Sequence, residues 1–436
     1  MRGCDSRPGL TFLRNLSCGI FLLGRGDGMV DSGDLKSPGR NAVWVRVPSP
    51  APMLHSLWYR LLARFFPTAP LVTVGISKTA LLHNFDEYAK AYPDFLLAPV
   101  LKSNAYGHDL GLVARTLDTY PLAFFMVDSL YEARRLRMIG VRSRILVMGY
   151  VRPESIARAR LSRLDFTITD IEQLREVLPL LKRPTRFHIK LDTGMHRQGI
   201  TEEQLEGVSA LLKKSPYAQV VGVCSHLADA DNTDEAFSRR QLAVWKRLVA
   251  SLTKTFPLLE YRHLSATKGV RFAQEAGTNV VRLGMGLYGF DTSPQTSVNL
   301  QPVLELRSVI ASLRTVPSGE SVGYNAAYTA SKDSLIATVP AGYFEGVDRR
   351  LSGKGSVLVR DVACPIVGRV SMNMVSVDVS KVNSVAVGDS VTLISRDPES
   401  PNTLPRLAAL VSSKEYRESM YVLLSHLPQH LKRVLE

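Results

Sequence analysis

The stretch LLAPVLKSNAYGHDL, residues 96–110, decides the fold class of this sequence. Its first six residues form a continuous apolar run of the length of a buried strand, and Lys102 ends that run. Burial of an ammonium group is costly, so a lysine at this place needs a specific partner. The residues that follow, 103–108, predict a loop at the carboxyl end of the strand.

Seven further short apolar runs follow, and amphipathic stretches such as SLYEARRLRMIG and DIEQLREVLPLLKR separate them. Eight strands that alternate with helices over about 230 residues predict an α/β fold, the (β/α)8 TIM barrel. An open doubly wound sheet is the alternative, but it would place a glycine-rich turn after the first strand, where this sequence has none. The predicted strands are 96–102, 124–127, 145–149, 166–169, 187–191, 220–224, 261–265 and 280–284.

The pattern changes near residue 300, where strands follow one another without helices. The stretches LELRSVIASLRTV, SLIATVPAG, GSVLVRDVACPIVG, VSVDVS and SVTLIS are joined by turns that contain Gly, Pro, Asn and Asp, as in antiparallel sheets. A last stretch, SSKEYRESMYVLLSHL, predicts a helix that closes the chain. The sequence therefore predicts a TIM barrel at residues 70–300 and a C-terminal, mostly β domain at residues 301–436.

The first residues differ from the rest. Residues 1–52 are rich in Gly, Pro and Ser and have no helical or alternating period, which predicts a disordered tail. An alternative is that this segment is not translated, because VRVPSP is what an in-frame reading of a transfer-RNA gene arm gives. Synthesis would then begin at Met53, and residues 53–69 would be an N-terminal extension.

Composition limits the class of protein. The 436 residues are 45% hydrophobic and 22% charged, which is ordinary for a globular protein. The net charge of +14 comes from scattered Lys and Arg without a nucleic-acid-binding motif, so we expect a small anionic ligand and no nucleic acid. No apolar run is long enough to span a membrane, so we expect no membrane partner. The four cysteines are too far apart for CxxC metal pairs and too few for a disulfide scaffold, which predicts a cytoplasmic protein without a metal.

Residues just after each barrel strand are the site candidates, because the active site of a TIM barrel lies at the carboxyl ends of its strands. The turn LGMGLYG at the eighth strand adds backbone N–H groups. The candidates are Lys102 and Tyr106 at the first strand, Lys190, Asp192 and Arg197 at the fifth, His226 at the sixth, His263 and Thr267 at the seventh, and Arg282, Gly284 and Met285 at the eighth.

These candidates suit an aldehyde cofactor that carries a phosphate. A desolvated lysine near other cations has a lowered pKa and can form a Schiff base. The N–H groups of Gly284 and Met285, with the hydroxyls of Thr267 and Tyr106, could hold a phosphate. Pyridoxal 5'-phosphate meets both requirements.

Seven motifs occur in a fixed order over both predicted domains: VLKSNAYGH, KLDTGMHRQG, SHLADADNTDE, VVRLGMGLYG, GYNAAYTA, VPAGYFEG and CPIVGRVSMN. Together they resemble the motifs of the alanine racemase family, from about Val72 to the C-terminus. The resemblance implies pyridoxal phosphate as cofactor, alanine as substrate, and the interconversion of L-alanine and D-alanine, which supplies D-alanine for peptidoglycan.

The resemblance also implies two catalytic bases. Lys102 is implied to be both the cofactor lysine and one base, and Tyr324 the other. Racemisation needs a base on each face of the Cα atom, since one removes the proton and the other returns it to the opposite side. In the family the tyrosine comes from the partner subunit, which implies a homodimer with two composite sites.

Roles at the cofactor follow for two residues. Arg282 is implied to face the pyridine nitrogen, and because arginine stays protonated, that nitrogen cannot also carry a proton. The ring is then a weaker electron sink than in most enzymes that use this cofactor. His226 is implied to link the tyrosine base to Arg282.

Roles at the substrate follow for four more residues. Arg197 is implied to reach the substrate carboxylate and to orient the tyrosine. Lys190 matches a lysine that can be carbamylated in relatives and then pairs with that arginine. The backbone N–H of Met372 is implied to bind the substrate carboxylate, and Tyr343 to lie at the substrate entrance. His263 and Asp192 are expected to support the site from behind.

The sequence departs from the family pattern at three places, which leaves alternatives open. Asn373 stands where many relatives have Asp, Ala266 and Thr267 replace Asn-Ser, and the C-terminal LLSHLPQHLKR is unusual. A racemase of broader specificity, for example for serine, is therefore the first alternative. A non-enzymatic pyridoxal phosphate-binding barrel would lack the second domain and Tyr324. Basic amino acid decarboxylases share the two-domain plan, but Cys364 lies in a predicted core strand rather than in their catalytic motif.

Overall fold

A computed structural model describes residues 70–291, 298–412, 423–424 and 426–436. The predictions for residues 1–52 and 53–69, and most of the predicted C-terminal helix, lie outside the described residues. Within the described part of the chain, no helix is long and apolar enough to cross a membrane.

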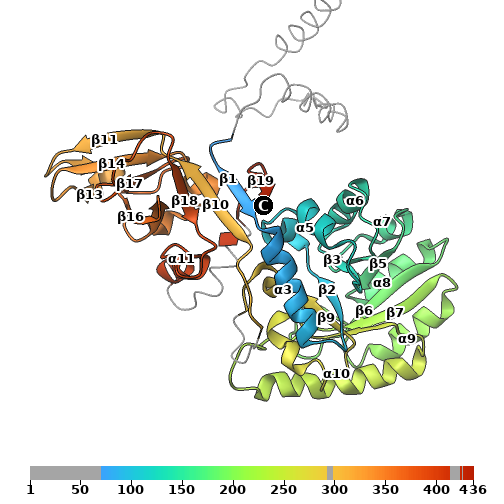
Figure 1. The fold of residues 1–436 in the computed structure, drawn as a ribbon. Helices are drawn as coiled ribbons and strands as arrows, with labels where there is room; N and C mark the ends of the chain where they lie inside the picture. Colours follow the sequence, from blue (N-terminus) through green and yellow to red (C-terminus); the bar gives the residue numbers. More distant parts are fainter. Residues whose placement is uncertain (1–69, 292–297, 413–422, 425) are drawn as a thin grey trace, which may run out of the picture. The chain divides into compact units, whose positions relative to one another are not determined.

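Eight parallel strands with surrounding helices form the first part of the described chain, drawn from teal to yellow in Figure 1. Strands β3 to β8 make one continuous sheet, and β2 pairs with β9. Isolated bridges from Leu97 to Leu122 and from Ala266 to Arg282 join the two sheets, so the strands close on themselves. The predicted TIM barrel is confirmed. Its strands are β2 (Leu96–Pro99), β3 (Phe125–Val127), β4 (Ile145–Val147), β5 (Leu164–Ile168), β6 (Thr185–Lys190), β7 (Ala218–Cys224), β8 (Tyr261–His263) and β9 (Val280–Leu283).

Side-chain caps begin several of the barrel helices. Ser77 accepts a hydrogen bond from the Ala80 N–H, Ser129 from the Glu132 N–H and Asp170 from the Glu172 N–H. Each helix then turns an apolar stripe toward the barrel, as with fully buried Trp245. The helices are α3 (Lys78–Ala91), α5 (Leu110–Leu117), α6 (Leu130–Met138), α7 (Pro153–Arg158), α8 (Ile171–Val177), α9 (Leu205–Lys214) and α10 (Ala236–Thr255).

The first strand is shorter than predicted. β2 ends at Pro99, and Lys102 begins the short helical segment α4 (Lys102–Tyr106) instead of ending the strand. The apolar residues Val100 and Leu101 belong to the connection, where the Leu101 N–H donates to the Met126 carbonyl. The predicted strand was too long because this connection is also buried and apolar, and the sequence pattern of a buried connection is the same as that of a buried strand.

The second part of the described chain is a nine-stranded sheet with one flanking helix, α11 (Leu404–Val411). The predicted antiparallel β strands are confirmed. They are β10 (Leu304–Val309), β11 (Ser312–Val316), β14 (Ser334–Val339), β15 (Ser356–Val359), β16 (Val362–Val367), β17 (Val375–Asp378) and β18 (Ser390–Ile394).

Two strands of this sheet come from the ends of the described chain. β1 (Thr73–Ile76), inside the predicted barrel range, pairs antiparallel with β10. The last element is a strand, β19 (Lys432–Leu435), which pairs in parallel with β1, so the chain does not end with the predicted helix but continues past it into the sheet. A parallel partner more than three hundred residues away leaves no local signal in the sequence.

Candidate active site

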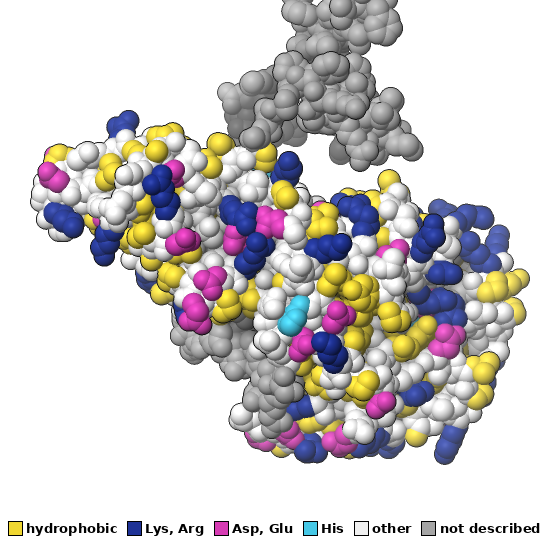
Figure 2. Space-filling view, viewed as in Figure 1, with side chains coloured by type: hydrophobic (Ala, Val, Ile, Leu, Met, Phe, Trp, Pro, Cys, Tyr) yellow, Lys and Arg dark blue, Asp and Glu magenta, His cyan; other side chains and the backbone are white. Residues whose placement is uncertain are grey.

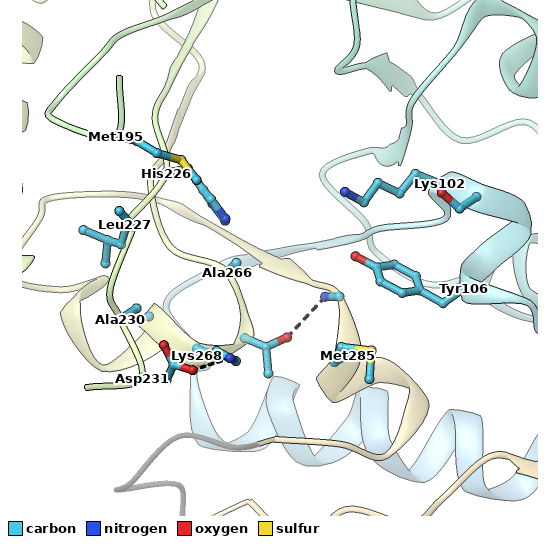
Figure 3. Close-up of a pocket in the computed structure, with 15 residues that line it drawn as sticks. Lys102, Tyr106, Met195, His226, Leu227, Ala230, Asp231, Ala266, Lys268 and Met285 are labelled. Atoms are coloured by element: carbon cyan, nitrogen blue, oxygen red, sulfur yellow. Dashed lines mark hydrogen bonds and ion pairs between the residues drawn. The ribbon is translucent and has the colours of Figure 1, made fainter. Parts of the chain in front are cut away.

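A cavity of about 440 Å³ opens at the carboxyl ends of the barrel strands (Figure 3). Lys102 and Tyr106 enter it from one side, and His226 and Met195 from the opposite side. Six of the predicted cofactor residues line it. They are Lys102, Tyr106, His226, Thr267, Gly284 and Met285.

The turn that presents Lys102 and Tyr106 is left-handed. Residues 103–106 all have φ between 52° and 56°, a region that costs roughly 1–2 kcal/mol for each residue other than glycine. Local hydrogen bonds hold it, because the Asn104 N–H donates to Glu132 Oε1 at 3.1 Å and Asn104 Oδ1 accepts from the Leu110 N–H at 3.0 Å. Strain of this kind persists at functional sites, where the surroundings fix it. The turn aims both side chains at the cavity.

Lys102 is prepared to act as a nucleophile. Desolvation lowers its pKa, and the nearby charges of Arg197 and Arg282 lower it further, while Asp128 opposes them. A lysine with a lowered pKa has more of the neutral amine that attacks an aldehyde. The direction of this pKa shift supports the prediction of Lys102 as the Schiff-base lysine.

The far end of the cavity has the shape and the donors of a phosphate site. Thr267 Oγ1 accepts hydrogen bonds from the N–H groups of Gly284 and Gly286, each at 3.2 Å. Its own hydroxyl hydrogen is then left to donate to an anion. A Cβ atom at Gly284 would lie 3.3 Å from the Tyr106 hydroxyl, so a side chain there would fill the space beside that hydroxyl.

A buried arginine, Arg282, lies behind the cavity and contacts His226, which lines it. Arg282 is 6% exposed, and its Nη2 donates to His226 Nδ1 at 3.1 Å and to the Leu264 carbonyl. Burial lowers the pKa of Arg282 to about 10, which leaves it protonated at neutral pH. Desolvation and the charge of Arg282 hold the pKa of His226 well below its usual value. Because Nδ1 accepts from Arg282, the neutral ring carries its proton on Nε2, which can donate into the site.

A chain of buried polar groups continues through the barrel interior. His263 Nε2 lies 2.9 Å from His188 Nδ1, and His188 Nε2 lies 3.3 Å from Asp165 Oδ2. Arg144 and Arg186 pair with Asp165 at 2.7 and 3.0 Å. His263 thus has the supporting position expected of it. His188 and Asp165 were missed, although a charged or imidazole side chain inside an apolar strand was the available signal.

Three predicted residues at the end of β6 are not part of the cavity lining: Lys190, the last residue of β6, and Asp192 and Arg197 in the loop that follows it. Lys190 Nζ donates to Gln198 Oε1 at 2.7 Å, and desolvation together with the charge of Arg282 lowers its pKa. Asp192 accepts the N–H groups of Gly194 and His196, so it shapes the turn that precedes Arg197. Arg197 acts on the site through its charge, since it lowers the pKa values of Lys102 and His226.

Sequence reasoning also missed an ion pair in the cavity wall. Lys268 and Asp231 pair beside Thr267, as the dashed line in Figure 3 shows. Both side chains are about one quarter exposed. Nothing in the sequence motifs pointed to Lys268 or Asp231 as site residues.

The predicted site residues of the β domain do not line the cavity of the same chain. Tyr324, Tyr343 and Met372 are 67%, 41% and 55% exposed. Tyr324 begins a short 3₁₀ turn, Tyr324–Ala326, between strands β12 (Ser321–Val322) and β13 (Tyr328–Thr329). Within one chain, Lys102 and Thr267 line the cavity, whereas Tyr324 is exposed to solvent.

Two loops of the β domain are held together by Asn373, one of the departures from the family pattern. Asn373 Nδ2 donates to Glu345 Oε1 at 2.8 Å, and Glu345 Oε2 accepts the Gly342 N–H at 2.8 Å. The Tyr343 N–H donates to the Ser371 carbonyl in the same region. Glu345 is 9% exposed, so an amide at position 373 satisfies an otherwise costly buried carboxylate.

Comparison with known proteins gives two family matches. A model described as alanine racemase, N-terminal domain, matches residues 76–292, and one described as alanine racemase, C-terminal domain, matches residues 303–434. Among curated relatives, the alanine racemase of Carboxydothermus hydrogenoformans is 33% identical over 340 residues, 77% of this chain and 92% of the relative. That of Sorangium cellulosum is 37% identical over 303 residues, 68% and 80% of the two chains.

Solved structures agree. The alanine racemase from Bacillus anthracis with bound L-Ala-P has a TM-score of 0.77 at 28% identity, covering 85% of this chain and 96% of that one. The biosynthetic alanine racemase from Pseudomonas aeruginosa has a TM-score of 0.73 at 29% identity, covering 84% and 100%.

Proposed function

The chain belongs to the alanine racemase family, and we propose that it interconverts L-alanine and D-alanine with Lys102 and Tyr324 as its two bases. The observation that carries the proposal is the cavity, in which a desolvated Lys102 faces His226 and the phosphate site of Thr267 and Gly284. The D-alanine would supply peptidoglycan synthesis.

The residues present fit pyridoxal 5'-phosphate as the cofactor. Lys102 would bond its aldehyde carbon, Arg282 would face its ring nitrogen, and Tyr106, Thr267 and the Met285 N–H would hold its phosphate. The Gly284 N–H, which donates to Thr267 Oγ1, would position the Thr267 hydroxyl for this contact. When bound, this cofactor withdraws electrons from the substrate amino acid and makes its Cα–H acidic.

Proton transfer then needs only the two bases. Tyr324 takes the Cα proton from L-alanine on one face, and Lys102 gives a proton to the opposite face, which leaves D-alanine. After this step Tyr324 holds one extra proton and Lys102 lacks one, and proton exchange of both groups with water restores them before the next turnover. The reverse reaction uses the same groups in the opposite order. Arg282 holds the His226 ring, and the Nε2–H of His226 would donate to the tyrosine oxygen that enters from the partner subunit and orient it.

The exposed position of Tyr324 supports a homodimer. Because Tyr324 lies outside the cavity of its own chain, the partner's copy would complete each site, and twofold symmetry gives two such sites. Arg197, the Met372 N–H and Tyr343 would then bind and admit the substrate. The lowered pKa of Lys190 favours the neutral amine that reacts with carbon dioxide, and the resulting carbamate would pair with Arg197.

Asn373→Asp is expected to loosen the substrate end of the site. It would set a second carboxylate within hydrogen-bond distance of Glu345, at a cost of roughly 1–3 kcal/mol. We expect a lower unfolding temperature and a KM for alanine raised about tenfold at a smaller change in kcat, which steady-state kinetics would measure.

The double variant Asn373→Asp with Glu345→Gln is the matched control. Its glutamine can accept the Gly342 N–H and donate to the new carboxylate at position 373, which restores both hydrogen bonds. Recovery of KM supports the positioning role. A KM that stays raised while the unfolding temperature recovers would show that Asn373 acts in some other way.

Substrate identity is tested by chiral chromatography of single L-amino acids incubated with the purified protein and pyridoxal phosphate. We expect D-alanine as the main product. Comparable amounts of D-serine or other D-amino acids would support the broader racemase, and retention of the cofactor without any D-amino acid would contradict enzymatic racemisation.

A further inference from the structure

We propose that the amino-terminal end of the barrel is a docking surface for an anionic lipid bilayer. The surface, here called the basic face, consists of the loops that precede β4, β5 and β6. It lies at the end of the barrel opposite the cavity, since the cavity opens at the carboxyl ends of the same strands.

Positive charge is concentrated in this part of the chain. Residues 134–186 contain thirteen Lys and Arg against five Asp and Glu, a net charge of +8 out of +14 for the whole sequence. More than half of the net charge therefore belongs to one stretch of the sequence, which corrects the expectation that the cations are scattered. Figure 2 shows Lys and Arg side chains crowded over the region that Figure 1 labels α6, α7 and α8.

Six of these cations form the basic face. β4, β5 and β6 are neighbours in the sheet, so the loops before them meet at one end of the barrel. Arg163 Nη1 donates to the Arg142 carbonyl at 3.3 Å, and Arg137 binds carbonyls of both their loops. The other four cations, Arg158, Arg160, Lys182 and Arg183, line one groove. The six are Arg142, Arg158, Arg160, Arg163, Lys182 and Arg183, of which the first five are exposed and Arg183 is half-buried.

The positive charges of these six side chains are not neutralised by ion pairs with acidic side chains of the same chain within the described residues. Among the residues that the structure describes, none of the six side chains makes an ion pair. Of the nearby acids, Asp165 binds Arg144 and Arg186, and Glu260 binds Arg186. Asp118 lies at the face itself, where its carboxylate accepts the backbone N–H groups of Arg142 and Ser143. Glu154 is the acid in the groove itself. The six cations are therefore available to an external anion.

Exposed apolar side chains at the same end favour a bilayer. Met138 and Ile139, where α6 ends, are 81% and 38% exposed, and Leu180 beside Lys182 is 40% exposed. Cations that bind lipid phosphates next to apolar tips that enter the interface are the usual pattern of peripheral membrane binding. The sequence predicted no membrane partner because it has no spanning segment, but surface binding does not require one.

Other occupants fit less well. Two copies of a basic face repel each other, so the face does not serve self-association. The loops 139–144, 158–163 and 178–184 contain no aromatic residue on which a nucleic acid base could stack. A bilayer would also leave the cavity facing water, so substrate could still enter.

The test is cosedimentation of the full-length holoenzyme with vesicles of phosphatidylglycerol and phosphatidylcholine, and with vesicles of phosphatidylcholine alone. We expect binding to the anionic vesicles only, released as salt rises from about 0.1 to 1 M, where the Debye length falls from about 10 to 3 Å. The patch variant reverses four charges, Arg158→Glu, Arg160→Glu, Lys182→Glu and Arg183→Glu. It should bind the anionic vesicles at least about tenfold more weakly, since each cation near the surface contributes several-fold.

A matched control reverses four exposed cations of the β domain that likewise make no ion pair within the described residues. Arg314→Glu, Lys332→Glu, Lys354→Glu and Lys381→Glu give the same net charge, so this variant should keep vesicle binding within about twofold if the basic face is the contact. A third variant, Met138→Ser with Leu180→Ser, should bind the anionic vesicles more weakly at about 0.1 M salt and keep the salt dependence of the wild type, because it loses apolar insertion but no charge.

Four outcomes would overturn the proposal. The first two are failure of the wild type to bind anionic vesicles and an equal loss of binding in the patch and control variants. The third is release of the protein by millimolar glycerol phosphate, which would indicate a site for a single phosphate. The fourth is tighter binding of single-stranded RNA than of vesicles through the same residues. Racemase activity of each variant in solution should match the wild type, which confirms that the chain is folded.

Discussion

Tyr324→Phe is expected to lower the rate of D-alanine formation from L-alanine by about 10²–10⁴-fold, the usual contribution of a positioned proton-transfer group. The side chain is 67% exposed in the single chain, so loss of its hydroxyl should leave the fold unchanged. The cofactor should also stay bound, because Lys102, Thr267 and Gly284 are untouched. Initial rates by chiral chromatography, with the absorbance of the bound cofactor, measure both.

Solvent exchange distinguishes this role from a merely structural one. With Tyr324 gone, Lys102 can still remove and return the Cα proton of D-alanine on its own face. We therefore expect D-alanine in deuterated water to exchange its Cα hydrogen without inversion, and L-alanine to exchange far more slowly. Normal racemisation, or equal exchange of both enantiomers, would refute Tyr324 as the second base.

Lys102→Ala is expected to remove the covalent attachment of the cofactor and at least about 10⁴-fold of the activity, since it eliminates the nucleophile and one base together. Desolvation and two nearby arginines lower the pKa of this lysine, so its charged form is not held by an ion pair whose loss would unfold the barrel. Borohydride reduction of the holoenzyme followed by peptide mapping should label Lys102 in the wild type. A label on any other lysine of the wild type would show that the assignment is wrong.

Mixing the two inactive variants tests the composite site. In a heterodimer, Lys102 of one chain meets Tyr324 of the other in one of the two sites, while the second site lacks both. Random reassociation makes half of the dimers heterodimers, so about a quarter of the wild-type activity should return. No recovery despite subunit exchange would mean that each chain uses its own tyrosine.

Much of the barrel and most of the cofactor site could be predicted from the sequence. Each parallel strand is a local apolar run, and the topology places the residue after it at a known end of the barrel. Lys102, Tyr106, His226, Thr267, Gly284 and Met285 were found in this way, and the structure brings them to one cavity.

Other features depend on contacts between distant segments. β19 is a strand because β1 offers it backbone hydrogen bonds, and β1 joins the sheet of the β domain although it precedes the barrel in sequence. The pairing of Asn373 with Glu345 likewise could not be read from either residue alone.

The sequence by itself determined the fold class, the order of the two domains, and which lysine and which phosphate-binding candidates to propose, because these depend on local periodicity and on residues a few positions apart. Only the tertiary structure decided which tautomer His226 adopts, that Tyr324 lies outside the cavity of its own chain, and that six unpaired cations share one end of the barrel. These features are set by distances between residues far apart in the chain, and such distances exist only once the chain has folded.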